Sequence, residues 1–372
     1  MLMNAVYLLT VLLYYCILVS IMATYRRRVQ RVGKSTFIVS LPNSWVREIG
    51  LEPKMSVVME VLPDLSLRIY VPSKQSKSSA TEHFISVDPT FSEDDVVREI
   101  IGGYVAGAAT LMVTYKGVRR EVVERAVNTA KEKLMGLEVV DEDAFNIMLQ
   151  VVVDPNLSNL SSVMKRMVRL SVSMHEDIVS YLTGSADKSI LEAVITRDNL
   201  VDKLYLLALR QLIAILRDPY EMSKRELRYY DAIYMTMFLK SVERVGDHAV
   251  NISRSLIQLD IVPTFLVEVY KSAIGVFKDS CESFMLVDKN MVMEVLRNVE
   301  KLKRLEEDVR SRYREELASR TGITRVLDAI TRIVARSIDI AEEVIDIYAL
   351  KKMDKLKLEE HEEEEAEQLK QI

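Results

Sequence analysis

Two pairs of carboxylates have the spacing needed to bind a cation. Asp198 and Asp202 are four residues apart, and so are Glu243 and Asp247. In a helix this spacing places both side chains of a pair on one face, within reach of one ion. Like charges that converge between helices are tolerated when a metal or a proton offsets them. The four acids therefore predict a site for a divalent or trivalent metal ion in a helical bundle.

The surroundings of the second pair support this interpretation without requiring it. Apolar residues crowd the same two turns, and Gly246 would let a neighbouring helix approach closely. His248 or Asn251 could add a ligand. The alternative is a set of ordinary salt bridges, for which the nearby cations are Arg197, Lys203 and Arg244.

A second cluster of charge is basic. Its five members, with no acid among them, are Arg26, Arg27, Arg28, Arg31 and Lys34. On a β-rich dimer such residues would contact DNA phosphates and release counterions, with recognition by shape and backbone more than by base sequence. The alternative is that they only flank a membrane anchor or form a charged fringe.

Nucleotide binding and catalysis have little support. Gly33-Lys34-Ser35 looks like the end of a P-loop, but Arg28 stands where that loop needs a glycine. A strand-like segment also follows where a helix should begin. The chain has no Glu-x-x-His pair, no histidine spacing typical of hydrolase zinc and no Gly-x-Ser-x-Gly motif. We therefore expect that the protein binds no nucleotide cofactor and is not an enzyme. The alternative, a metal-dependent hydrolase, predicts that Glu243→Ala abolishes turnover.

The composition and the N-terminal residues limit the classes of protein to which the chain can belong. With 372 residues, 49% hydrophobic and 28% charged, the chain has room for several globular domains. Two distant cysteines predict a reducing, intracellular setting. Residues 1–25 carry no charge and could span a bilayer, but Met22 could equally be the native first residue. Both alternatives predict a cytoplasmic body, tethered to the inner face of the membrane only if residues 5–25 are an anchor.

Short strands and one helix should position the basic cluster. Alternation predicts strands over 28–32 and 36–41, a helix over 43–49, and a hairpin of 56–61 and 65–71 around Pro63-Asp64. Fewer than fifty residues make a thin core, so a dimer is expected. A polar linker follows, and then a small α/β region with β-like segments over 111–115 and 147–153 and helices over 94–106 and 119–134.

Long helices should position the acids. A helical period predicts six of them, over 160–182, 188–216, 223–259, 264–286, 289–320 and 323–353. They form two sets of three, because 242–252 aligns without gaps on 330–340 and 200–203 aligns on 305–308. Thr331 and Ala335 replace the second acid pair in the later copy, which leaves Glu307 and Asp308 on the preceding helix. Any metal site should therefore be one-sided.

These segments resemble two families. The stretch RRVQRVGKSTFIVSLPNSWVREIGL resembles the AbrB/SpoVT family, whose swapped-hairpin dimers bind DNA, although Lys54-Met55 replaces the usual Gly-Asp. The stretches VERVGDHAVNI and RDNLVDKLY resemble PhoU, the phosphate-uptake regulator with two three-helix bundles. The whole combination, with REIIGGYVAGA and EKLMGLEVVDED in the intervening α/β region, is similar to archaeal PhoU-like regulators that carry an N-terminal AbrB domain. The resemblance implies that Glu243 and Asp247, at the acid positions of the PhoU signature, lie near bound metal.

The expected fold is multidomain and mainly α. Its parts are a possible anchor or mis-assigned start (1–25), an AbrB-like swapped-hairpin domain (26–72), a linker (73–81), a small α/β domain (82–154), two PhoU-type three-helix repeats (157–260 and 261–353) and a charged tail (354–372). The resemblance implies a dimeric regulator of phosphate uptake and phosphate-responsive transcription. Its partners would be DNA and a phosphate ABC transporter or its sensor partner. The alternative is a membrane-associated adaptor of the transporter whose AbrB-like head only dimerises.

Overall fold

The computed structural model describes residues 24–33, 36–62, 66–71, 81–152, 159–259 and 263–370, with side chains in the last helix up to residue 356. Two compact units make up the chain. The first unit comprises two segments, the chain up to Val61 and Leu67–Ser73. The second unit comprises Leu62–Ser66 and the chain from Lys74 onward. The expected anchor, Lys34, the turn at Pro63-Asp64 and most of the linker lie outside the described residues.

The N-terminal unit consists of two hairpins and a short helix. Strand β1 (Gln30–Val32) pairs antiparallel with β2 (Thr36–Ile38), and β3 (Val58–Val61) with β4 (Leu67–Tyr70). Helix α2 (Asn43–Glu48) lies between them in sequence and follows Pro42, with no side chain among the described residues that caps its first turn. All predicted elements of this unit are present but shorter. None of its described residues is buried.

The turn at Lys54 has a backbone that favours glycine. Lys54 adopts a φ of 76°, in the left-handed region that side chains disfavour. The turn is closed by a hydrogen bond of 3.1 Å from the Met55 amide to the Glu52 carbonyl. A lysine thus occupies a turn position whose backbone favours glycine.

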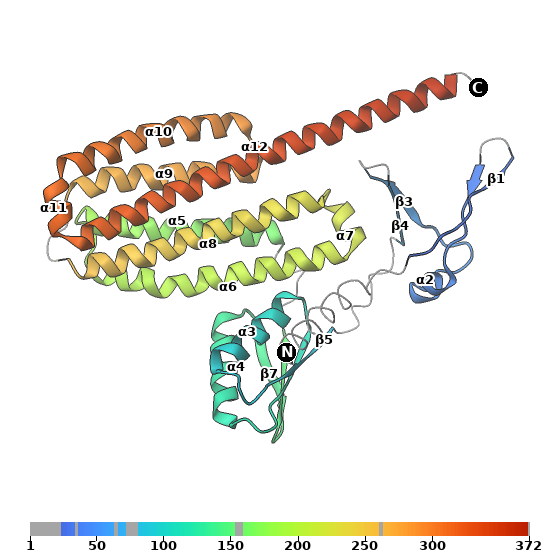
Figure 1. The fold of residues 1–372 in the computed structure, drawn as a ribbon, viewed down its shortest axis with the longest axis horizontal. Coiled ribbons are helices and arrows are strands. Elements are labelled where there is room, and N and C mark those ends of the chain that lie inside the picture. The colour runs from blue at the N-terminus through green and yellow to red at the C-terminus, as the bar shows by residue number, and fades with distance from the viewer. Residues whose placement is uncertain are drawn as a thin grey trace, which may run out of the picture. The chain divides into compact units, whose positions relative to one another are not determined.

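The α/β region places two helices on a four-stranded sheet (Figure 1). The elements are β5 (Glu82–Ser86), α3 (Glu93–Val105), β6 (Thr110–Thr114), α4 (Arg120–Lys133), β7 (Leu137–Glu142) and β8 (Asn146–Val151). The strand order is β5-β6-β8-β7, with β5 and β6 parallel and the other pairs antiparallel. Leu111, Val113, Ile147 and Leu149 are buried, so one face of the sheet packs on the region's core.

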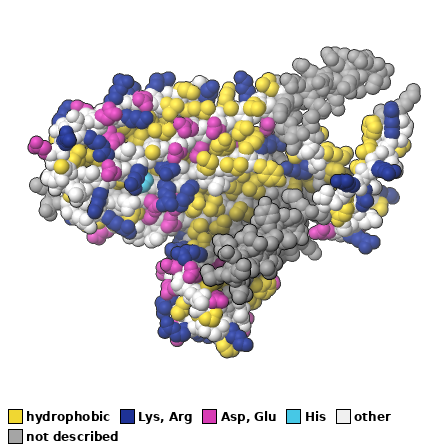
Figure 2. All heavy atoms as spheres, in the orientation of Figure 1, with side chains coloured by type: hydrophobic (Ala, Val, Ile, Leu, Met, Phe, Trp, Pro, Cys, Tyr) yellow, Lys and Arg dark blue, Asp and Glu magenta, His cyan; other side chains and the backbone are white. Residues whose placement is uncertain are grey.

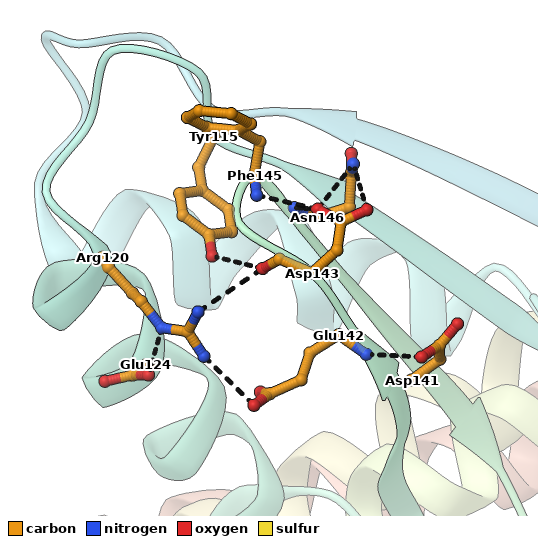
Figure 3. Close-up of polar contacts among 8 residues, drawn as sticks. All are labelled: Tyr115, Arg120, Glu124, Asp141, Glu142, Asp143, Phe145 and Asn146. Atoms are coloured by element: carbon orange, nitrogen blue, oxygen red, sulfur yellow. Dashed lines mark hydrogen bonds and ion pairs between the residues drawn. The ribbon is translucent and has the colours of Figure 1, made fainter.

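A polar network fixes the β7–β8 turn to the start of α4 (Figure 3). The Asp143 carboxylate accepts hydrogen bonds from the amides of Phe145 and Asn146 at 2.8 and 2.9 Å. Arg120 forms ion pairs with Glu124 at 2.7 Å and with Glu142 at 3.1 Å. Such a closed set of partners fits a structural role better than a catalytic one.

The rest of the second unit is helical. The helices are α5 (Leu160–Leu182), α6 (Ser189–Arg217), α7 (Pro219–Lys224), α8 (Tyr229–Ile257), α9 (Phe265–Leu286), α10 (Lys289–Arg312), α11 (Arg314–Ser319) and α12 (Thr321–Lys370). Helices α5, α6 and α8 pack together, as do α9, α10 and α12, and α8 also packs on α12. The long helices run side by side (Figure 1), around one continuous hydrophobic core. The predicted two sets of three helices are therefore present.

Three helix boundaries were predicted wrongly. The single helix predicted over 223–259 is instead interrupted between α7 and α8. At the break, Glu226 has a φ of 53°, and the Asp231 carboxylate accepts a hydrogen bond from the Arg228 amide at 2.8 Å. The helix expected over 289–320 is divided at Tyr313 into α10 and α11. Helix α12 continues through the expected tail, since Glu, Lys, Leu, Gln and Ala there favour helix.

Candidate functional site

The structure brings the four predicted acids together. Asp198 and Asp202 lie on α6, and Glu243 and Asp247 lie on α8, which packs on α6. Gly246 makes the close approach possible, because a Cβ at that position would be 3.2 Å from Oδ1 of Asp198. The sequence patterns on the two helices thus converge on one region, which we call the acid cluster.

Burial and mutual repulsion perturb the acid cluster. Burial, followed by the negative charges of its three neighbours, raises the pKa of Asp198 to about 7. The pKa of Asp202 is also raised, first by burial and then by the charges of Glu243 and Asp247. Groups that resist losing their protons in this way would gain most from a bound cation.

Cations from α8 partly offset the acid cluster. Lys240 pairs with Glu243 at 2.7 Å, and Arg244 pairs with Asp247 at 2.9 Å. Arg197, another predicted partner, instead pairs with Asp177 at 2.7 Å. The salt-bridge alternative therefore accounts for part of the cluster only.

Two buried oxygens bear on whether these residues fit a metal ion. Oδ1 of Asp198 and Oε2 of Glu243 are buried and have no hydrogen-bond partner among the described residues. An all-oxygen donor set suits hard cations such as Mg²⁺ or Ca²⁺. However, no group of three or more His, Cys, Asp or Glu side chains in the described parts of the chain is arranged to hold one ion. The donor chemistry fits a hard cation, but the side chains as they are placed do not form a closed site.

The two other suggested ligands lie elsewhere. His248 is 8% exposed, and both it and Asn251 line a hollow between α8 and α12. Burial and then the charge of Arg332 lower the pKa of His248 to about 4; Asp247 opposes this shift, and Arg336 and Arg244 add smaller contributions to it. His248 is therefore a neutral side chain at physiological pH.

A buried histidine that the sequence patterns did not single out bonds to the backbone of α8 at Val245. His175 of α5 is fully buried, and its Nε2 bonds to the Val245 carbonyl at 2.9 Å. Its Nδ1 bonds to the Tyr270 hydroxyl of α9. Burial lowers the pKa of His175 to about 4, so Nε2–H donates and Nδ1 accepts. His175 thus links three helices directly beside the acid pair of α8.

The second copy replaces the acid cluster with an arginine network. The Thr331 hydroxyl donates to Glu306, and Arg310 donates to the same carboxylate at 2.9 Å and to Thr331 at 3.2 Å. The acid that contacts Thr331 is thus Glu306, which the alignment of the two copies did not single out beside Glu307 and Asp308. Asp308 pairs with Arg312 at 2.7 Å and is exposed. The positive charge that a metal would supply is therefore built into the second copy.

The basic cluster lies on the surface of the N-terminal unit. Arg26, Arg27, Arg28 and Arg31 are exposed, while Lys34 lies outside the described residues. The Arg31 guanidinium lies 6.0 Å from the centre of the Phe37 ring, across the β1–β2 pair. Arginines that extend over exposed rings can reach phosphates.

Comparisons with known proteins concern the helical part. Residues 164–256 match the family model of the PhoU domain. The crystal structure of the phosphate transport system regulatory protein PhoU from Streptococcus pneumoniae is 15% identical, covering 50% of this chain and 91% of that chain with a TM-score of 0.44. That of PhoU from Pseudomonas aeruginosa is 19% identical, covering 51% and 95% with a TM-score of 0.42. No curated protein matches the chain.

The matched residues run from α5 to the end of α8 and include the whole acid cluster. Within the described part of the chain, no helix has the length and apolar character needed to cross a membrane. Residues 164–256 of the helical part are thus similar to the PhoU domain.

Proposed function

We propose that this chain is a cytoplasmic, non-enzymatic regulator of phosphate uptake and of phosphate-responsive transcription. The observation that carries the proposal is the PhoU domain over residues 164–256, with four carboxylates between its helices. The helical bundles would contact a phosphate ABC transporter or its sensor partner. The AbrB-like head would bind DNA.

The head would bind DNA as a homodimer. Its described residues include no buried side chain, and Phe37, Val29 and Met59 are 68%, 66% and 62% exposed. Isolated two-stranded hairpins are marginally stable in water, so a second copy that covers these side chains would supply the missing core. Two copies would also bring two sets of Arg26, Arg27, Arg28 and Arg31 onto one platform.

A metal ion would have a structural role in the bundle. Asp198 and Asp202 of α6 and Glu243 and Asp247 of α8 would hold it. The ion would offset their repulsion and link the two helices, as bound cations do in other carboxylate sites. A regulator whose bundle shape depends on metal could present different surfaces with and without it.

Two measurements test the proposal. DNA fragments upstream of phosphate-transport genes should bind the full chain with an affinity that falls steeply with salt, and Arg27→Gln with Arg31→Gln should reduce both affinity and slope. Deletion of the gene should change phosphate uptake by intact cells. Salt-independent DNA binding would reject the head's role, and unchanged uptake at high and low phosphate would reject the bundle's role.

A further inference from the structure

The hollow that His248 and Asn251 line lies between the two helical repeats, and none of the four carboxylates of the acid cluster lines it. It has a volume of about 500 Å³, between α8 and α12. Three arginines line it: Arg254 of α8, and Arg325 and Arg332 of α12. Figure 2 shows Lys and Arg side chains gathered around a histidine on the face that α8 and α12 form.

These three arginines differ from their neighbours in forming no ion pair at contact distance. Arg244 and Arg336, on the same two helices, pair with Asp247 at 2.9 Å and Asp339 at 2.8 Å. Arg254, Arg325 and Arg332 form no ion pair within the part of the chain that the structure describes, although Arg254 is near enough to Asp198 for its charge to oppose the rise in the pKa of that acid. Three unpaired guanidinium groups around one hollow repel one another unless an anion joins them.

The other lining residues suit an oxyanion. Asn251 and Gln258 add uncharged donors from α8, whereas the Ser255 hydroxyl donates to the Asn251 carbonyl at 2.9 Å. The single acid in the lining, Asp328, is occupied by Arg310 at 3.0 Å. The hollow therefore offers many donors and little competing negative charge.

We propose that this hollow, which we call the arginine hollow, binds a small anion that carries one or more phosphoryl groups. The planar fork of arginine forms paired hydrogen bonds to phosphate oxygens, and several such forks converge here. The open volume accommodates more than a single phosphoryl group. Because α8 ends the first repeat and α12 ends the second, an anion held by both would join the two repeats. The proposal stands without the regulatory function proposed above.

The test uses the full-length chain after chelation and dialysis, with orthophosphate, pyrophosphate and tripolyphosphate as probes in titration calorimetry. We expect at least one probe to bind, and Arg332→Gln and Arg325→Gln each to weaken its binding by at least about tenfold. Arg312→Gln removes a positive charge from α10 and should leave binding unchanged. Circular dichroism identifies any variant that fails to fold. If one of the two hollow variants, Arg332→Gln or Arg325→Gln, does not fold, the other serves as the test.

Three results would overturn the proposal. These are no binding by any of the three probes, binding that survives both hollow substitutions, or binding that requires added metal and is lost in Asp247→Asn. The last result would place the anion on a metal at the acid cluster. Failure of DNA binding or of uptake control would leave these outcomes unaffected, so the two proposals fail separately.

Discussion

Gly246 of α8 lies so close to Asp198 of α6 that a Cβ at residue 246 would be 3.2 Å from Oδ1 of Asp198. This proximity brings the acid pairs of two helices into one cluster. It also leaves the Asp198 oxygen buried and without a partner among the described residues. The close packing of the helices therefore brings like charges together, and a bound cation would offset their repulsion.

Asp198→Asn should have opposite effects with and without metal. In chelated protein above pH 7, where Asp198 is mostly ionised, the substitution removes one of four neighbouring negative charges and should stabilise the fold by about 1 kcal/mol. With a divalent metal present, the same change removes a ligand and should lower the melting temperature relative to wild type. Thermal unfolding with and without metal measures both effects. Asp308→Asn, at an exposed pair, serves as the control and should respond equally in both conditions.

Equal shifts of Asp198→Asn in the two conditions would show that no metal binds at the cluster. Metal content of the purified protein, measured beside Asp247→Asn, gives an independent check. An unchanged metal content in that variant would place any metal elsewhere.

Arg310→Ala should destabilise the second repeat by about 1–3 kcal/mol. The side chain of Glu306 is only 12% exposed, and Arg310 is its charge partner. Removing the arginine leaves a largely buried carboxylate with only the Thr331 hydroxyl as a donor. Arg312→Ala breaks a pair whose side chains are 65% and 55% exposed, and should cost less than about 0.5 kcal/mol. Urea unfolding of both variants measures the difference, and equal losses would contradict the assigned role of Arg310.

The helical half was largely predictable because its apolar residues recur with a helical period over long stretches. Helix α5 begins and ends where that period predicts. Strands β5 and β7 were missed. In β7 only Leu137 is buried, so the strand lacks the alternation that identifies a half-buried strand. The break before α8 depends on the backbone of Glu226, which no apolar period encodes.

The acid cluster was predictable because the i, i+4 spacing fixes each pair on a helix face. The arginine hollow was not, because its residues come from two helices about seventy positions apart, and their meeting depends on how α8 packs on α12. The buried Glu343 could have been found. It lies three positions after Ile340 and four before Ile347, on a buried side of the helix.

Glu343 should make stability fall as pH rises. Its side chain is 3% exposed, neither oxygen has a hydrogen-bond partner among the described residues, and its pKa is raised to about 8, first by burial and then by Asp339 and Asp346. Cys281 of α9 also faces it. The cations beside it are engaged elsewhere: Lys240 with Glu243, Arg244 with Asp247, and Arg336 with Asp339.

The folded chain therefore keeps this proton to a higher pH than the unfolded chain does. Stability should decline between about pH 5 and 9, by at most about 4 kcal/mol from this group. Glu343→Gln should flatten the decline, whereas Glu342→Gln, at an exposed neighbour, should not. Urea midpoints across this pH range measure the slope, and parallel slopes for wild type and Glu343→Gln would contradict the assignment.

Lys54→Gly should stabilise the N-terminal unit even though it removes a side chain. Lys54 holds a φ of 76° in a turn closed between Glu52 and Met55, and relief of that left-handed strain gives about 1 kcal/mol. Greater freedom of the unfolded chain offsets part of this gain, so a net gain of about 0.5 kcal/mol is expected. Lys54→Ala removes the charge but retains the Cβ, so it should give no gain. Hydrogen exchange of the β3–β4 amides measures both variants. Equal protection in the two would mean that the charge of Lys54, and not its backbone, governs the turn.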